Sequence, residues 1–411
     1  MSYASWAEYW WDVVTGPSSL VDRVVEELGQ DRSIILHVPR DLPWRHEMRD
    51  VIRVRLQGEL EATSLVVDEV DVADDTAKDP SAWTDVGRGL LDRFALRNVR
   101  LNFRGDDVTE YLMSAGVLAN RVVWVKGLNA KTLPAWKSFC RSWHPHGLTD
   151  GLFVVEIPTM AEATNVPEES GESVAIVDYH EYINDYSAQL FCGTMLDAAD
   201  ASGLSTARKR YLAAVLTHIC HGDVETAALL VDCYQTGKMS LRSALATVSE
   251  ELPLRGNTNS TDSNTISESI QYAYAPTNTT PEHPLTAARR GDWHSIEVSV
   301  WQAQLEVLFP LIESERLRIV DSLAPDLWPL INQGSITQYN AKVNNPRDVE
   351  LGTLVYLMAK REGNGERVLY VPDVAIRKRI HLLHDCRNNL AHGDCCSPAQ
   401  VDQLLEDKHK A

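Results

Sequence analysis

The chain has 411 residues and a formal net charge of −19, with 44% hydrophobic and 24% charged residues. This composition is typical of a globular protein of two or three domains and excludes a collagen-like, coiled-coil or wholly disordered chain. The negative charge excludes a protein that coats DNA without sequence preference, because such binding depends on cations that contact phosphates.

The charge is distributed unevenly. Residues 281–411 carry a formal charge of −3 and residues 1–280 carry −16, so the C-terminal part could approach a polyanion that the N-terminal part mostly repels. No run of about 18 apolar residues is present, and the first 29 residues lack the layout of a signal peptide. We therefore expect a cytoplasmic protein with no membrane segment and with its seven cysteines reduced.

Residues 33–178 alternate short apolar runs with amphipathic stretches such as Trp44–Leu56 and Asp85–Leu96. This alternation predicts βαβ units, and the Val- and Ile-rich runs suit strands buried on both faces. Residues 1–178 are therefore predicted to form an α/β domain with a mostly parallel sheet. Its strands are expected at Ser33–Val38, Ser64–Val70, Asn98–Phe103, Arg121–Val125, Leu152–Ile157 and Ser173–Val177.

The rest of the chain is predicted to be helical. Apolar residues at steps of three and four, as in Ala188–Ala201 and Ala207–His218, predict a helical domain over residues 179–255. Residues 256–284 are rich in Asn, Ser, Thr and Pro and indicate a flexible linker. Residues 285–411 are predicted to form an all-α helical bundle. Its helices are expected at Ile296–Val320, Glu350–Lys360, Val374–His392 before Gly393, and from Ser397 to about Lys408.

The most informative stretch is His381–Pro398, HLLHDCRNNLAHGDCCSP. On a helix it places Arg387 in an apolar stripe, where a guanidinium is costly unless it is paired or faces a polar cavity. A polar edge runs beside the stripe. The stripe holds Ile376, Ile380, Leu383, Arg387 and Leu390, and the edge holds His381, His384, Asn388 and His392.

Three of these side chains suit cleavage of a phosphodiester without a metal. His392 can take a proton from a 2′-hydroxyl or protonate the leaving 5′ oxygen. Arg387 can neutralise charge on the pentavalent phosphate, and Asn388 can hold a phosphate oxygen or orient the histidine.

The run Arg387-Asn388-Asn389-Leu390-Ala391-His392-Gly393 resembles the signature of HEPN domains, in which a His follows an Arg by a few residues on a helix. The resemblance implies a helical bundle that forms a homodimer. It also implies a composite, metal-independent ribonuclease site of Arg387, Asn388 and His392 that leaves a cyclic phosphate. Many similar proteins act in bacterial defence or as toxins. Others only bind partners, and an ion pair of Arg387 with an acid such as Glu350 would be a purely structural account of that residue.

The strand order of residues 1–178 resembles a P-loop NTPase of the AAA or STAND kind. Ser33–Val38 would lead into the phosphate loop, the strand at 121–125 would carry the Walker B acid, and the strand at 152–157 would be the sensor strand. The loop after residue 38, PRDLPWRH, has no Gly, Lys, Ser or Thr, and Lys126 replaces the acid. We predict a degenerate domain without ATP hydrolysis, in which Arg40, Arg45 and Lys126 could bind an anion. The alternative is a scaffold without ligand.

A metal site is not expected. His384, Cys386, His392, Cys395 and Cys396 cluster in the sequence, but their spacing does not match a zinc pattern. We also expect no cofactor.

These features predict a defence- or toxin-type effector whose C-terminal dimer cleaves RNA under the control of the N-terminal domain. The alternative is a non-enzymatic adaptor or sensor that dimerises through its helical part and binds a protein partner through its α/β part. A third reading is an active NTPase with a non-standard loop.

Overall fold

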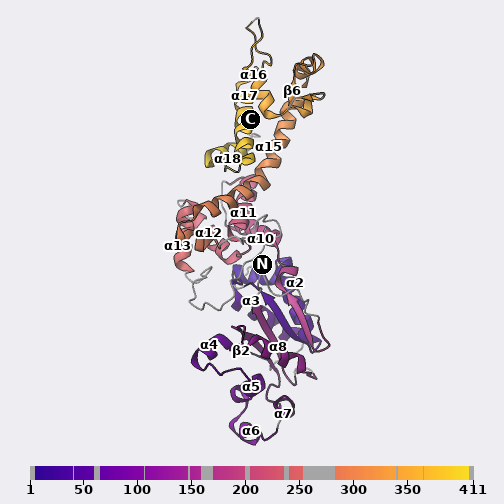
Figure 1. The fold of residues 1–411 in the computed structure, drawn as a ribbon, viewed down its shortest axis with the longest axis vertical. Helices are drawn as coiled ribbons and strands as arrows, with labels where there is room; N and C mark the ends of the chain where they lie inside the picture. Colours follow the sequence, from indigo (N-terminus) through magenta and orange to yellow (C-terminus); the bar gives the residue numbers. More distant parts are fainter. Residues whose placement is uncertain are drawn as a thin grey trace. The chain divides into compact units, whose positions relative to one another are not determined.

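The structure is a computed structural model, and in it the chain forms two compact units (Figure 1). Unit 1 comprises residues 1–191, 222–229 and 247–286, and unit 2 comprises the remainder, so the helical middle contributes to both. Almost all of the expected linker lies outside the described residues. These are 5–39, 41–59, 65–105, 107–146, 149–158, 170–199, 204–235, 240–252, 283–338, 341–363 and 365–406.

Unit 1 is built on a parallel five-stranded sheet, as the sequence predicts. The strand order is β2-β3-β4-β1-β5, so β1 lies between β4 and β5. Ile34 of β1 is in register with Val154 of β4, and both strands are almost completely buried. The strands are β1 (Ser33–Val38), β2 (Val66–Asp71), β3 (Arg121–Lys126), β4 (Leu152–Pro158) and β5 (Val174–Asp178).

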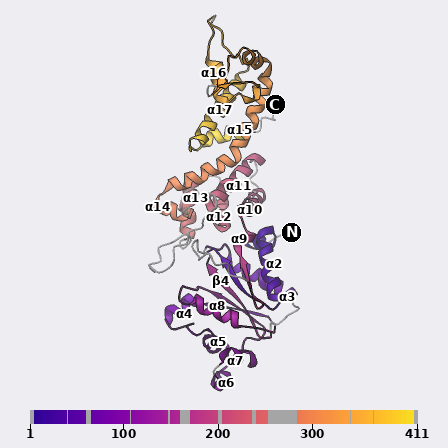
Figure 2. The ribbon, with the colours of Figure 1, turned by 45° about the vertical axis from the view of Figure 1, so that its right-hand side comes forward.

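Helices lie on both faces of this sheet (Figure 2). On one face, strand residues such as Val123 and Phe153 form one apolar core with the indole rings of Trp83, Trp136 and Trp143. The helices on this side and at its edge are α4 (Val72–Lys78), α5 (Val86–Phe94), α6 (Arg97–Asn102), α7 (Val108–Ser114) and α8 (Leu133–Ser142).

The opposite face is packed by the N-terminal helices and by aromatic residues. Trp10 and Trp11 are fully buried, and the ring of Phe191 meets Trp10 and Trp44 edge-on. The helices of this side are α1 (Trp6–Asp12), α2 (Thr15–Gly29), α3 (Arg45–Glu59) and α9 (Tyr179–Tyr182), and α10 (Asp185–Ala198) follows.

The prediction of a strand at residues 98–103 is wrong. Residues 98–103 have an alternating pattern, NVRLNF, but residues 97–102 form the helix α6. Leu96 and Leu101 are largely exposed there, so the pattern is not produced by a buried sheet face. A half-buried alternation and a short exposed helix cannot be distinguished by periodicity alone over six residues.

The helices of the chain's second half follow the predicted order closely. Unit 2 is organised around one 40-residue helix, α15, against which α11 and α17 pack. The helices of the chain's second half, of which α12, α13 and α14 are divided between the two units, are α11 (Thr206–Cys220), α12 (Val224–Gln235), α13 (Leu241–Glu251), α14 (Pro284–Arg290), α15 (Trp293–Asn332), η1 (Pro346–Asp348), α16 (Leu351–Ala359), α17 (Val374–Ala391) and α18 (Pro398–Leu405), with a hairpin of β6 (Thr337–Gln338) and β7 (Ala341–Lys342).

Helix α15 is longer than predicted and is bent along its length (Figures 1 and 2). It contains Pro310, Pro325 and Pro329, each of which removes a backbone donor from the helix and favours a kink. The apolar pattern predicts that the helix ends at residue 320. The structure extends it to residue 332, and Leu323, Leu327 and Ile331, spaced one turn apart, continue its buried face.

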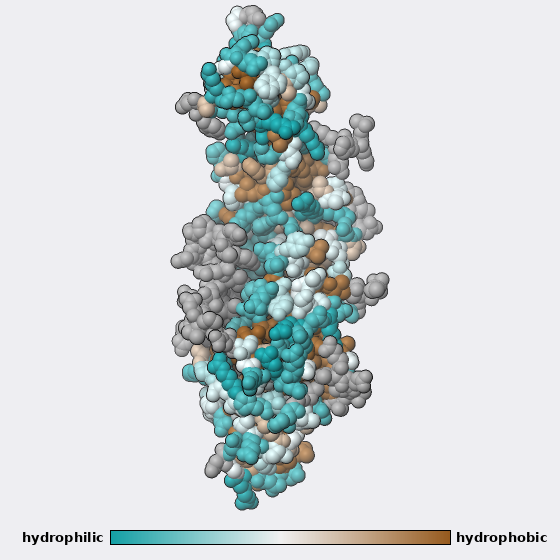
Figure 3. All heavy atoms as spheres, turned by 90° about the vertical axis from the view of Figure 1, so that its right-hand side faces the viewer, coloured by the Kyte–Doolittle hydropathy of each residue, from teal (hydrophilic) through white to brown (hydrophobic). Residues whose placement is uncertain are grey.

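The surface in Figure 3 has hydrophilic side chains spread over it, with apolar side chains in smaller patches between them. None of the helices in the described part of the chain is both long and apolar enough to cross a membrane.

Candidate functional site in the C-terminal helical unit

The motif singled out by the sequence lies at the C-terminal end of α17. Asp373 caps the start of this helix by accepting hydrogen bonds from the amides of Ala375 and Ile376. His392 is the C-cap residue, and Gly393 follows with φ of +85°. A residue in this left-handed conformation ends a helix, and glycine adopts it without a steric penalty from a Cβ atom.

The buried face of α17 differs from the predicted stripe at two positions, and one of them is Ile376, which is only half-buried. Ile380, Leu383 and Leu390 are buried as expected, but Cys386 takes the place expected for Arg387. Arg387 is half-buried. The buried guanidinium of this helix is that of Arg379, which the sequence reasoning missed.

Arg379 is held by an acid and by backbone carbonyls. Its Nε lies 2.7 Å from Oε1 of Glu315, and its second nitrogen pairs with the other oxygen of that carboxylate. It also donates to the carbonyl oxygens of Gln403 and Leu404 near the end of α18. This residue therefore joins α15, α17 and α18, and its role is structural.

The candidate catalytic residues lie along one end of α17. The amide nitrogen of Asn388 lies 3.0 Å from Nε2 of His384, and Arg387 donates to the amide oxygen of Asn388 over 3.4 Å. His392 is exposed at the cap. Residues five positions apart on a helix are separated by about 140° around its axis, so Arg387 and His392 of one chain do not face the same point.

Three cysteines, Cys386, Cys395 and Cys396, lie in or beside this motif. The thiols of Cys386 and Cys396 are both buried, and a hydrogen bond to Cys386 together with burial raises the pKa of Cys396. Metal ligation requires thiolates, which this environment disfavours for Cys396, whereas the same hydrogen bond lowers the pKa of Cys386. No group of three or more His, Cys, Asp or Glu in the described ranges is placed to hold a metal ion.

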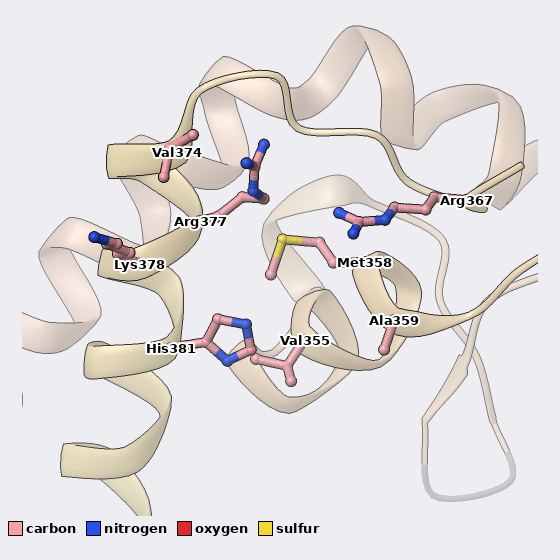
Figure 4. A pocket seen from close by; sticks show the side chains of 8 residues that line it. All are labelled: Val355, Met358, Ala359, Arg367, Val374, Arg377, Lys378 and His381. Atoms are coloured by element: carbon pink, nitrogen blue, oxygen red, sulfur yellow. The ribbon is translucent and has the colours of Figure 1, made fainter.

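A pocket of about 370 Å³ lies between α16 and α17, at the opposite end of α17 from His392 (Figure 4). Cationic side chains line it together with apolar ones, and His381 of the predicted polar edge is among them. The sequence reasoning did not single out this pocket. A signal for it exists: Lys360, Arg361, Arg367, Arg377 and Lys378 lie within 19 residues of an otherwise acidic chain.

Two of the three anion-binding residues predicted in unit 1, Arg45 and Lys126, are paired with acids. Arg40 lies outside the described residues. Arg45 lies 3.5 Å from the carboxylate of Glu156, and Nζ of Lys126 lies 2.7 Å from that of Glu69. A phosphate at either cation would have to compete with a carboxylate already in place.

This cluster lies on one face of the sheet, close to the carboxyl ends of its strands. The carboxyl ends of β1 and β4 are adjacent, and the chain leaves them toward opposite edges of the sheet. There Glu156 is only 3% exposed and accepts hydrogen bonds from Arg49 at 3.1 Å and from the indole of Trp124. Side chains of opposite charge thus neutralise one another on this face of the sheet.

No protein-family model matches this chain, and no curated protein matches it by sequence.

Proposed function

We propose that this protein is an effector whose C-terminal helical unit forms a homodimer and cleaves RNA without a metal, under the control of the N-terminal unit. The observation that carries the proposal is the RNNLAHG motif at the end of α17, where an exposed His392 follows a half-buried Arg387. The N-terminal unit supports its part of the proposal by its parallel strand order, in which β4, the expected sensor strand, lies between β1 and β3.

The proposed site is composite because one chain does not aim Arg387 and His392 at the same point. Two copies of α17 side by side would bring two arginines and two histidines to one phosphate. One His392 takes the proton of the 2′-hydroxyl, whose oxygen attacks the phosphorus. The other protonates the departing 5′ oxygen, and the arginines stabilise the charge on the phosphate oxygens. The products are a cyclic phosphate and a 5′-hydroxyl end.

The proposal predicts that His392→Ala abolishes RNA cleavage while leaving the fold and the dimer intact. Loss of a general acid–base group lowers the rate by about a hundredfold or more. Total RNA from cells that express wild type or variant is compared on a denaturing gel, and the purified proteins are assayed in EDTA. His294→Ala is the matched control, because His294 is exposed at the start of α15 and outside the motif.

Cleavage that persists at the wild-type rate in His392→Ala would overturn the assignment of this residue. Cleavage that disappears in EDTA would overturn the metal-free mechanism. Intact RNA with both proteins, together with a partner captured by the N-terminal unit, would favour the adaptor instead. That alternative is supported by the acidic N-terminal part, in which Arg45 and Lys126 are already ion-paired.

A further inference from the structure

The pocket between α16 and α17 has no role in the proposed cleavage. Its volume of about 370 Å³ lies within the range of pockets that hold small ligands, about 300–1,000 Å³. It is separated from His392 by the length of α17 between residues 381 and 392, which at about 1.5 Å per residue is about 16 Å.

The charges in this pocket point to an anion. In Figure 4 the guanidinium of Arg367 extends toward Met358 from one side of the pocket. Arg377 lies on the other side with its guanidinium turned toward the loop before α17, and His381 lines the pocket below them. None of the residues that line the pocket is acidic. Two cations that line one pocket without an acidic neighbour among the lining residues favour an anion bound between them.

The two arginines retain donors for such a ligand. Nη1 of Arg377 donates to the backbone carbonyls of Val371 and Pro372, the latter over 2.9 Å, which fixes the orientation of its guanidinium. A guanidinium has five N–H donors, so others stay available. No described residue accepts a hydrogen bond from the side chain of Arg367. Paired guanidinium groups match the geometry of phosphate oxygens.

The remaining wall is apolar. Val355 and Met358 of α16 form the floor in Figure 4, and Val374 at the start of α17 is 54% exposed beside them. An inorganic anion would leave these side chains in contact with water, whereas an organic phosphate can cover them. The flexible thioether of Met358 adapts to a flat ring such as a nucleobase.

We propose that this pocket binds a nucleoside monophosphate group, with its phosphate between Arg367 and Arg377 and its base or sugar against Val355 and Met358. The group is either a free mononucleotide or one residue of an RNA chain. The proposal does not depend on RNA cleavage, because it rests on the pocket alone.

The test is equilibrium binding with the full-length protein. The probes are AMP and CMP by titration calorimetry and a fluorescent single-stranded RNA of eight nucleotides by polarisation, in EDTA. Inorganic phosphate and adenosine are the comparison ligands. We expect AMP or CMP to bind more tightly than either, because each comparison ligand makes only half of the contacts.

The decisive variant is Arg367→Glu, which reverses one charge without breaking a side-chain hydrogen bond or ion pair to a described residue. It is expected to weaken binding by about tenfold or more. Arg318→Glu is the matched control, since Arg318 is an exposed residue of α15 outside the pocket. Arg377→Lys keeps the positive charge but loses the planar guanidinium. It should also weaken binding, and this second test does not depend on charge reversal.

The outcomes separate the sources of the ligand. Arg367-dependent binding of mononucleotide alone identifies a free nucleotide, and Arg367-dependent binding of the RNA identifies a residue of the chain. Absence of binding by every nucleotide probe, or equal weakening by Arg367→Glu and Arg318→Glu, overturns the proposal. His392→Ala should leave nucleotide binding unchanged. Failure of the cleavage proposal can therefore be distinguished from failure of the binding proposal.

Discussion

At the scale of single residues, Arg379 shows how a buried cation can be structural. Arg379 is 7% exposed and its guanidinium is neutralised by Glu315, while two carbonyls near the end of α18 accept further hydrogen bonds from it. A buried ion pair adds little net stability compared with an apolar pair of the same volume. Removal of one partner is costly, because the other charge is left uncompensated.

Arg379→Ala is therefore expected to destabilise the packing of α17 and α18 by about 3 kcal/mol, at the lower end of the cost of breaking a buried pair. Hydrogen exchange of the amides in these two helices measures the effect without requiring the whole chain to unfold in one step. Arg318→Ala is the control for loss of an exposed arginine. The double variant Arg379→Met with Glu315→Leu should recover most of the protection, and equal protection in wild type and Arg379→Ala would contradict the structural role.

The same helix shows what its sequence could and could not predict. Steps of three and four identified Ile380, Leu383 and Leu390 as buried, and Gly393 as the stop. They did not decide between the neighbours Cys386 and Arg387, because adjacent residues lie only about 100° apart and both border the buried face. The choice depends on the packing of α15 and α16, which a single sequence does not contain.

At the scale of elements, the sheet of unit 1 carries ion-paired side chains on one face, and Glu69 of β2 pairs there with Arg49 and Lys126. Burial raises the pKa of Glu69, but hydrogen bonds from Lys126 and Arg49 outweigh this effect and hold that pKa below its ordinary value. A carboxylate with a lowered pKa stabilises the folded state above its unfolded pKa, near 4.5. That contribution is lost as the pH falls through the lower, folded pKa.

Glu69→Gln is therefore expected to be less stable than wild type at pH 7 and to approach it as the pH falls below about 4. Denaturant midpoints followed by tryptophan fluorescence over this pH range measure the difference. Asp50→Asn, which removes one partner of the exposed pair with Arg53, should change little at any pH. Parallel pH curves for wild type and Glu69→Gln would show that this carboxylate does not contribute.

The elements themselves were predictable where burial is uniform. The Val- and Ile-rich runs of β1, β3 and β4 identified strands because both faces of these strands are covered. The helix at residues 97–102 was not predictable. Leu101 is exposed there, and an exposed apolar side chain in this position produces the same alternation as a half-buried strand. The network of Glu156, Arg49 and Trp124 was also beyond prediction, because it joins β4, α3 and β3 only after folding.

At the scale of the whole molecule, the charge is partitioned between an acidic N-terminal part and a nearly neutral C-terminal part. In unit 1 the candidate cations Arg45 and Lys126 are neutralised by carboxylates. In unit 2, no described residue forms an ion pair with Arg367 or Lys378. Cations that are not neutralised in this way are those that attract phosphates.

The partition predicts where RNA contacts the full-length protein. Exposed aromatic rings that can stack on bases, those of Tyr356 and Tyr370, lie in the same segment as the cations of the pocket. Ultraviolet crosslinking of single-stranded RNA in EDTA, with mapping by mass spectrometry, should therefore find its sites within residues 351–406 and few in unit 1. The crosslinked yield should fall steeply as salt is raised, because phosphate contacts release counterions. Crosslinks concentrated in unit 1, or a yield independent of salt, would show that RNA is not recognised by this surface and would favour the adaptor.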